Sequence, residues 1–94
     1  MTKLHQFVTA QDAALRQAAL IQGVIDDMAR TVQILSVDIR TEEERVRVFD
    51  LSDPKYPILA RGLKARRQNL QVTIAFLEKR LYAVTGGRLP AAAA

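Results

Sequence analysis

Two series of residues, each repeating every seven positions, dominate the first half of the chain. Interleaved at spacings of three and four, they form the a and d positions of a heptad repeat, in which only Gln11 and Glu42 are polar. Such a pattern becomes one apolar stripe only on a helix, so it predicts a single helix over residues 4–50 with another helix packed along it. The first series is Leu4, Gln11, Ala18, Ile25, Val32, Ile39 and Val46, and the second is Phe7, Ala14, Ile21, Met28, Leu35, Glu42 and Phe49.

A proline-rich segment, residues 51–57, interrupts this repeat. Pro54 and Pro57 lie three positions apart in it, a pattern typical of a turn followed by a new helix. We expect the second helix over residues 57–85 and a flexible tail over residues 86–94, which begins with two glycines that accept the left-handed conformation of a helix end. The second helix has its own seam: Ala60, Leu63, Arg67, Leu70, Ile74, Leu77, Leu81 and Val84.

Residues 45–51 allow two interpretations. Their apolar and polar side chains alternate, which also suits a short strand. A lone strand without a sheet partner is poorly stabilised, so helix is favoured for this segment.

Folding the two helices against each other predicts a register. Antiparallel pairing about the prolines places Phe49 opposite Ala60 and continues, layer by layer, to Ile25 opposite Val84. Within this register the only charged residue of each seam, Glu42 and Arg67, face each other. A pair of this kind selects one alignment, because a slipped register leaves both charges against apolar neighbours. The alternative is that both side chains are hydrated near the turn.

The pattern also predicts a partner for the hairpin. Residues 4–24 extend beyond the end of the second helix, and an isolated amphipathic helix is marginal in water. The first helix carries a second, partial stripe interrupted by Asp27. We expect two hairpins to form a homodimeric four-helix bundle, whereas a bend at Gly23 would instead give a three-helix monomer. The second helix has an additional stripe at Ile58, Gly62, Ala65, Asn69, Val72, Phe76 and Ala83, and the partial stripe of the first is Leu20, Val24, Thr31 and Ile34.

The composition argues against catalysis. The chain has no cysteine, which excludes disulfides, thiolate metal sites and a cysteine nucleophile. His5 is the only histidine and has no acidic residue at ligand spacing, and Asp26 and Asp27 point about 100° apart on a helix. We therefore predict no enzyme activity, no cofactor and no metal.

The net charge of +4 raises the question of an anionic partner. Acidic residues at 42–44 and Asp50 face the basic cluster of the second helix in the predicted hairpin, and no aromatic residues interleave with it for base stacking. We find neither a signal peptide nor a membrane span and expect a cytoplasmic protein. The candidate anion-binding residues are Arg61, Lys64, Arg66 and Arg88.

Together these features predict an all-α protein, a long antiparallel helical hairpin that dimerises into a four-helix bundle. Its expected function is to bind proteins as an adaptor, assembly factor or small chaperone-like partner, through the stripe that includes Ile58, Gly62, Ala65, Val72 and Phe76. The alternative is a basic accessory protein that binds the nucleic-acid backbone without sequence specificity.

Overall fold

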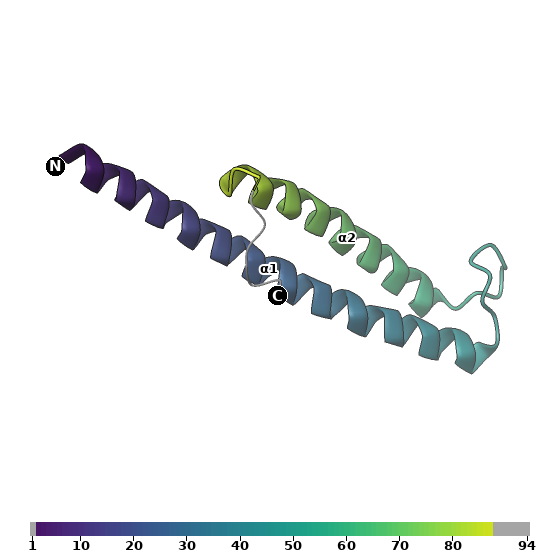
Figure 1. Ribbon diagram of the computed structural model, residues 1–94. Helices are drawn as coiled ribbons and strands as arrows, with labels where there is room; N and C mark the ends of the chain where they lie inside the picture. The colour runs from purple at the N-terminus through teal and green to yellow at the C-terminus, as the bar shows by residue number, and fades with distance from the viewer. Residues whose placement is uncertain (1, 88–94) are drawn as a thin grey trace.

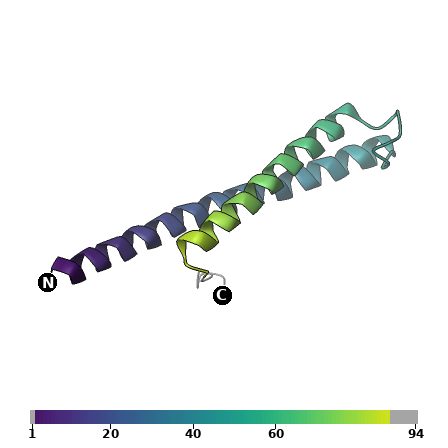
Figure 2. The ribbon, with the colours of Figure 1, turned by 90° about the horizontal axis from the view of Figure 1, so that it is seen from above.

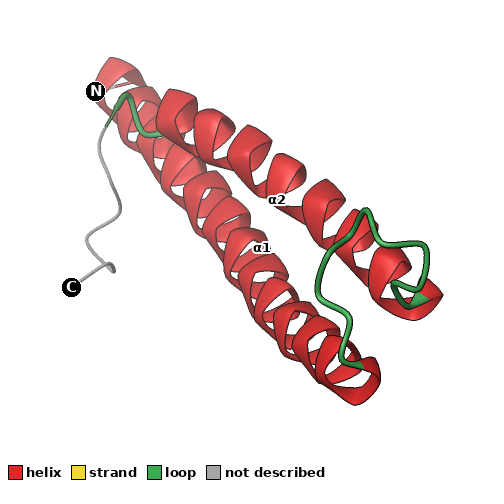
Figure 3. Ribbon diagram, turned by 90° about the vertical axis from the view of Figure 1, so that its right-hand side faces the viewer, coloured by secondary structure: helices red, strands yellow, loops and turns green. Residues whose placement is uncertain are grey.

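A computed structural model describes the backbone of residues 2–87 and the side chains of residues 9–87. It contains two helices, α1 (Thr2–Val46) and α2 (Ile58–Val84), joined by residues 47–57. The helices lie side by side and run in opposite directions, which confirms the predicted helical hairpin (Figure 1). The described residues contain no strand, so the strand interpretation of residues 45–51 was wrong (Figure 3).

The molecule is a thin rod. Its extents are 69 × 21 × 16 Å and its radius of gyration is 19.6 Å, whereas a compact domain of this length has a radius of gyration of about 12 Å. Seen from above, α2 crosses α1 at a shallow angle and leaves the N-terminal part of α1 without a neighbour (Figure 2). A rod of two helices has a narrow interior, which limits how much apolar surface one chain can bury.

The helix α1 is continuous over its 45 residues. Gly23 lies inside it without a break, so α1 does not fold back on itself there as the three-helix alternative requires. Thr41, which starts a sequence resembling a capping box, instead donates its hydroxyl to the carbonyl of Val37 at 2.9 Å within the same helix. The unbroken heptad phase across Gly23 therefore predicted the backbone correctly.

The prediction of helix to residue 50 was wrong at its end, because α1 stops at Val46. Arg47 has a φ of +61°, a left-handed conformation that ends the helix. Two short turns follow: the Asp50 carboxylate accepts the backbone N–H of Ser52 at 2.9 Å, and the Asp53 carboxylate accepts that of Lys55 at 2.8 Å. These bonds satisfy the backbone outside a helix and give residues 47–57 an ordered path.

The ends of α2 lie close to their predicted positions. Pro57 occupies the N-cap with extended backbone, φ −64° and ψ 132°, as expected for a proline that starts a helix. At the other end Gly86 and Gly87 have positive φ, and their N–H groups bond to the carbonyls of Ala83 and Tyr82. This pair of bonds is a Schellman motif, which the double glycine makes accessible. The rest of the predicted tail, residues 88–94, lies outside the described residues.

The core follows the predicted seams. Among the described side chains, every buried hydrophobic residue except Tyr56 occupies a seam position of one helix or the other. Phe49 departs from the prediction, because it lies beyond the end of α1 and is exposed. The buried residues are Ala18, Ile21, Ile25, Leu35, Ile39, Tyr56, Ala60 and Leu81.

The free end of the hairpin shows how far α1 extends. Leu81, the last buried residue of α2, packs in a cluster with Ala18, Ile21 and Ile25. Leu15, one turn earlier on α1, is exposed. The N-terminal part of α1 thus projects past α2 (Figure 1).

Candidate functional site

The side of α2 that faces away from α1, hereafter the α2 outer face, is apolar and uncovered. Ile58 and Phe76 are 87% and 65% exposed, and Val72 is 59% exposed. Ile58 and Gly62 each lie two positions from the buried Ala60, which places them on the far side of the helix at 100° per residue. Its residues, all exposed, are Ile58, Gly62, Ala65, Asn69, Val72, Phe76 and Ala83.

The α2 outer face carries no side chain at one point, Gly62. Gly62 is exposed, and a Cβ added there would meet no atom within 4 Å. A glycine inside a helix costs about 1 kcal/mol relative to alanine, and nothing within the single chain requires it. Its position on the face leaves room for a neighbouring backbone.

A second apolar surface, the α1 outer face, lies on the other helix. It comprises Leu20, Val24, Ile34 and Val37, which are exposed. Ile34 and Val37 border a shallow depression with Gln33 and Asp38. Two exposed apolar faces on one thin hairpin are typical of helices that pack into larger bundles.

The closed end of the hairpin holds a polar cluster that sequence reasoning missed. Tyr56 is only 3% exposed, and its hydroxyl donates to the carboxylate of Glu43 at 2.7 Å. The Lys64 ammonium lies 3.2 Å from the same carboxylate and 5.1 Å from the centre of the Tyr56 ring. The Arg61 guanidinium lies 5.5 Å from that ring centre. The cluster joins the connecting segment to both helices.

Three groups of this cluster, Glu43, Tyr56 and Lys64, change one another's pKa. The hydrogen bond from Tyr56, together with Lys64, holds the pKa of Glu43 below its ordinary 4.5 despite partial burial. Burial and the Glu43 carboxylate raise the pKa of Tyr56. The bond to Tyr56 and the Glu43 charge raise the pKa of Lys64. At neutral pH the arrangement therefore favours a charged Glu43 and Lys64 around a neutral tyrosine.

This geometry predicts a pH dependence of stability. Because the pKa of Glu43 is lower in the folded chain than in the unfolded one, its contribution is complete above about pH 4.5 and is lost as the pH falls through the folded value. In urea unfolding at a series of pH values, Glu43→Gln should be less stable than the natural chain at pH 7, and the difference should shrink below pH 4.5. Glu44→Gln, at the exposed neighbouring position, is the control. A difference that stays constant with pH would contradict the assignment.

The predicted pair of Glu42 and Arg67 is replaced by two other contacts. Glu42 accepts hydrogen bonds from Arg45, one turn along α1. Arg67 donates to the hydroxyl of Ser36 at 3.0 Å, six residues before Glu42 in α1. The observed contacts differ from the predicted pair because the connecting segment, residues 47–57, begins earlier than predicted. As a result, α2 packs against earlier residues of α1. Glu43 and Lys64 form a charged contact between the two helices.

The candidate anion-binding residues are only partly available. Lys64 is half-buried in the polar cluster, and Arg61 donates to the carbonyl of Leu51 at 3.0 Å while lying over Tyr56. Arg66 is exposed. Arg88 lies outside the described residues. Of the described candidates, Arg61 and Lys64 thus already have partners within the chain.

The described residues offer little for other chemistry. They contain no group of three or more histidine, cysteine, aspartate or glutamate residues placed to hold a metal ion. His5 lies outside the described side chains. Over the described residues, neither helix combines the length and apolar character needed to cross a bilayer. Comparisons with protein-family models, with curated proteins and with solved structures found no match.

Proposed function

We propose that the protein is a non-enzymatic helical module that self-associates and binds other proteins through its apolar helix faces. In this proposal two hairpins form a homodimeric four-helix bundle. The module then acts as an adaptor, an assembly factor or a small chaperone-like partner. The observation that carries the proposal is the exposure of the α2 outer face, above all of Ile58, Val72 and Phe76.

The free energy of burial supports an association. Exposed side chains of this size each gain about 1.5–3 kcal/mol when they are fully buried. A contiguous face of them on a soluble monomer typically marks a contact with another protein. The projecting part of α1 also supports association. Leu15 lies on α1 before the residues that pack against Leu81 of α2, and it is exposed.

The test is the dependence of the unfolding temperature on protein concentration. If folding is coupled to association, the Tm of the natural chain rises with concentration. Phe76→Asp places a charge in the centre of the α2 outer face and should make the Tm independent of concentration. Ala75→Asp introduces the same charge at the adjacent exposed position, off the face, and should retain the dependence. A concentration-independent Tm for the natural chain would contradict the proposal.

A nucleic-acid function is the second candidate, favoured by the charge of α2, which holds six basic residues and one acidic residue. It needs basic groups aimed at phosphates. Lys64 is instead paired with Glu43, and Arg61 contacts Tyr56 and Leu51. We expect only weak binding to a fluorescent duplex DNA or RNA at physiological salt. Tight binding that weakens steeply with salt would favour this second function.

A further inference from the structure

We propose that the α2 outer face of one chain packs against the α1 outer face of a second copy. This inference rests on the self-association proposed above and names the two surfaces that meet. It follows from the charges that border each face and from the need to cover both faces at once.

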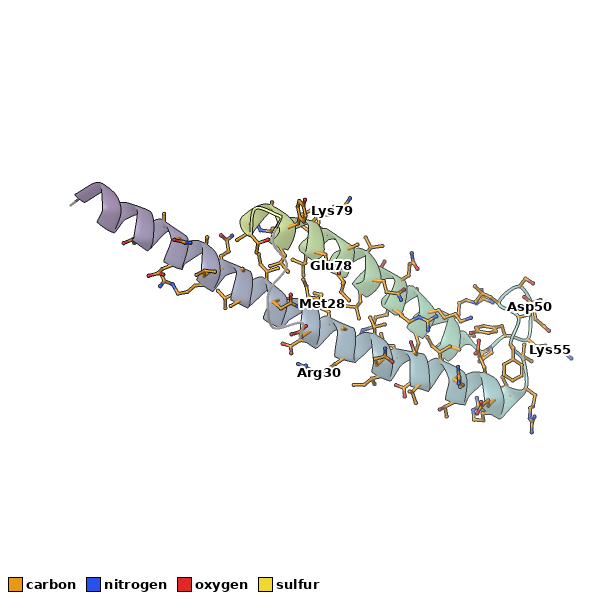
Figure 4. The ribbon with its side chains drawn as sticks, in the orientation of Figure 1. Met28, Arg30, Asp50, Lys55, Glu78 and Lys79 are labelled. Atoms are coloured by element: carbon orange, nitrogen blue, oxygen red, sulfur yellow. The ribbon has the colours of Figure 1, made fainter. Side chains whose placement is uncertain are left out.

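The α2 outer face has basic borders. Arg66 and Arg80 lie exposed along one edge and Arg61 along the other. Lys79 is exposed on the face itself, at the same heptad position as several of its apolar residues. Glu78 is the only acidic residue of α2; its side chain points toward α1, whereas Lys79 points away from it (Figure 4). A helix that covers this face therefore meets positive charge on both sides, which favours an acidic partner.

The α1 outer face supplies acidic residues at the required positions. Asp27 lies three residues after Val24 and seven before Ile34, and Asp38 lies four after Ile34, so both share the face with these apolar residues. Both aspartates are exposed. Asp27 pairs with Arg30 one turn along the helix, and both side chains are mostly exposed, a pair of small energetic weight that does not prevent a new contact.

The opposite charge of the helices argues against the simplest alternative, α2 against α2 of the second copy. That pairing brings two basic-edged faces together and leaves the α1 outer face uncovered. The pairing of α2 with α1 of the second copy joins opposite charges. When the two chains are related by a two-fold axis, the pairing occurs twice. Within a single chain it cannot form, because the α2 outer face points away from α1.

A charge-exchange experiment tests the pairing. One variant carries Arg66→Glu and Arg80→Glu on the border of the α2 outer face, and the other carries Asp27→Lys and Asp38→Lys on the α1 outer face. Each alone places like charges across the proposed interface and should raise the self-dissociation constant by about tenfold or more, measured by sedimentation equilibrium at low salt. Mixed in equal amounts they restore opposite charges at both contacts, so the mixture should associate as tightly as the natural chain.

Each other outcome has a definite meaning. If the aspartate variant associates like the natural chain, the α1 outer face is not part of the contact and this inference is wrong, although the proposed self-association stands. A mixture that stays dissociated also overturns the inference. If the natural chain itself is monomeric, the proposed function fails together with the inference. Circular dichroism shows whether each variant stays helical. A double variant that loses its helical signal is replaced by a single substitution on the same helix, Arg80→Glu on α2 or Asp38→Lys on α1.

Discussion

Replacing Tyr56 with alanine is expected to lower the free energy of unfolding by about 3 kcal/mol or more. The ring is almost fully buried at the closed end of the hairpin, where it lies beneath the cations of Arg61 and Lys64. Its removal creates a cavity, and it also leaves the half-buried Glu43 carboxylate without the hydroxyl that donates to it. Both effects weaken the contact of the connection with the two helices.

Urea unfolding at a fixed protein concentration measures this loss. Tyr56→Phe keeps the ring and removes only the hydroxyl, so it should cost about 1.5–3 kcal/mol, the range for a hydrogen bond to a charged group. Tyr82→Ala removes the other tyrosine of the chain, which is exposed, and should cost less than about 1 kcal/mol. Equal losses at Tyr56 and Tyr82 would show that the closed end of the hairpin is not packed as described.

Replacing Ile39 with alanine should lower the free energy of unfolding by about 2–5 kcal/mol. Ile39 is 3% exposed in the seam of α1, and a core this narrow has few other side chains to compensate for a cavity. A hairpin of two helices has a small free energy of unfolding, so the expected loss is close to the whole of that free energy.

The matched control for this prediction is Val37→Ala, two residues away on the exposed side of the same helix. It should change the free energy of unfolding by about 0.5 kcal/mol or less in the unassociated chain. Chemical unfolding of both variants, followed by the helical signal in circular dichroism, gives the comparison. A similar loss for the two variants would mean that the described interior is not the interior in solution.

The backbone was largely predictable because one periodic pattern determines it. A heptad repeat kept in phase across Gly23 favours a continuous helix, and Pro57 followed by a second repeat predicts where the chain turns and starts again. The buried residues fall on the predicted seams for the same reason, since periodicity reports which side of a helix is apolar.

The details at the turn were not predictable from the pattern. The left-handed Arg47 ends α1 although the heptad runs on to Phe49, because local backbone conformation overrides periodicity there. The exact alignment of the helices then depends on the path of residues 47–57, which is set by the side-chain bonds of Asp50 and Asp53. The contacts of Glu42 and Arg67 followed from that alignment, and they differ from the predicted ones.

Tyr56 illustrates a second limit. A tyrosine between two prolines in a turn reads as a surface residue, and nothing in its neighbours along the chain indicates burial. Its surroundings are assembled from Glu43 and Lys64, which come from different helices. Such a cluster depends on tertiary contacts. The only signal in the sequence was an excess of acidic residues at 42–44 placed to meet the basic residues of the second helix.

The mass of the natural chain in solution is the most direct test of the proposed dimer. We propose that a second copy covers the exposed faces of α1 and α2. Light scattering on a sizing column should therefore give twice the single-chain mass of 10.5 kDa. A mass of 10.5 kDa that persists as the protein concentration is raised would contradict the claim.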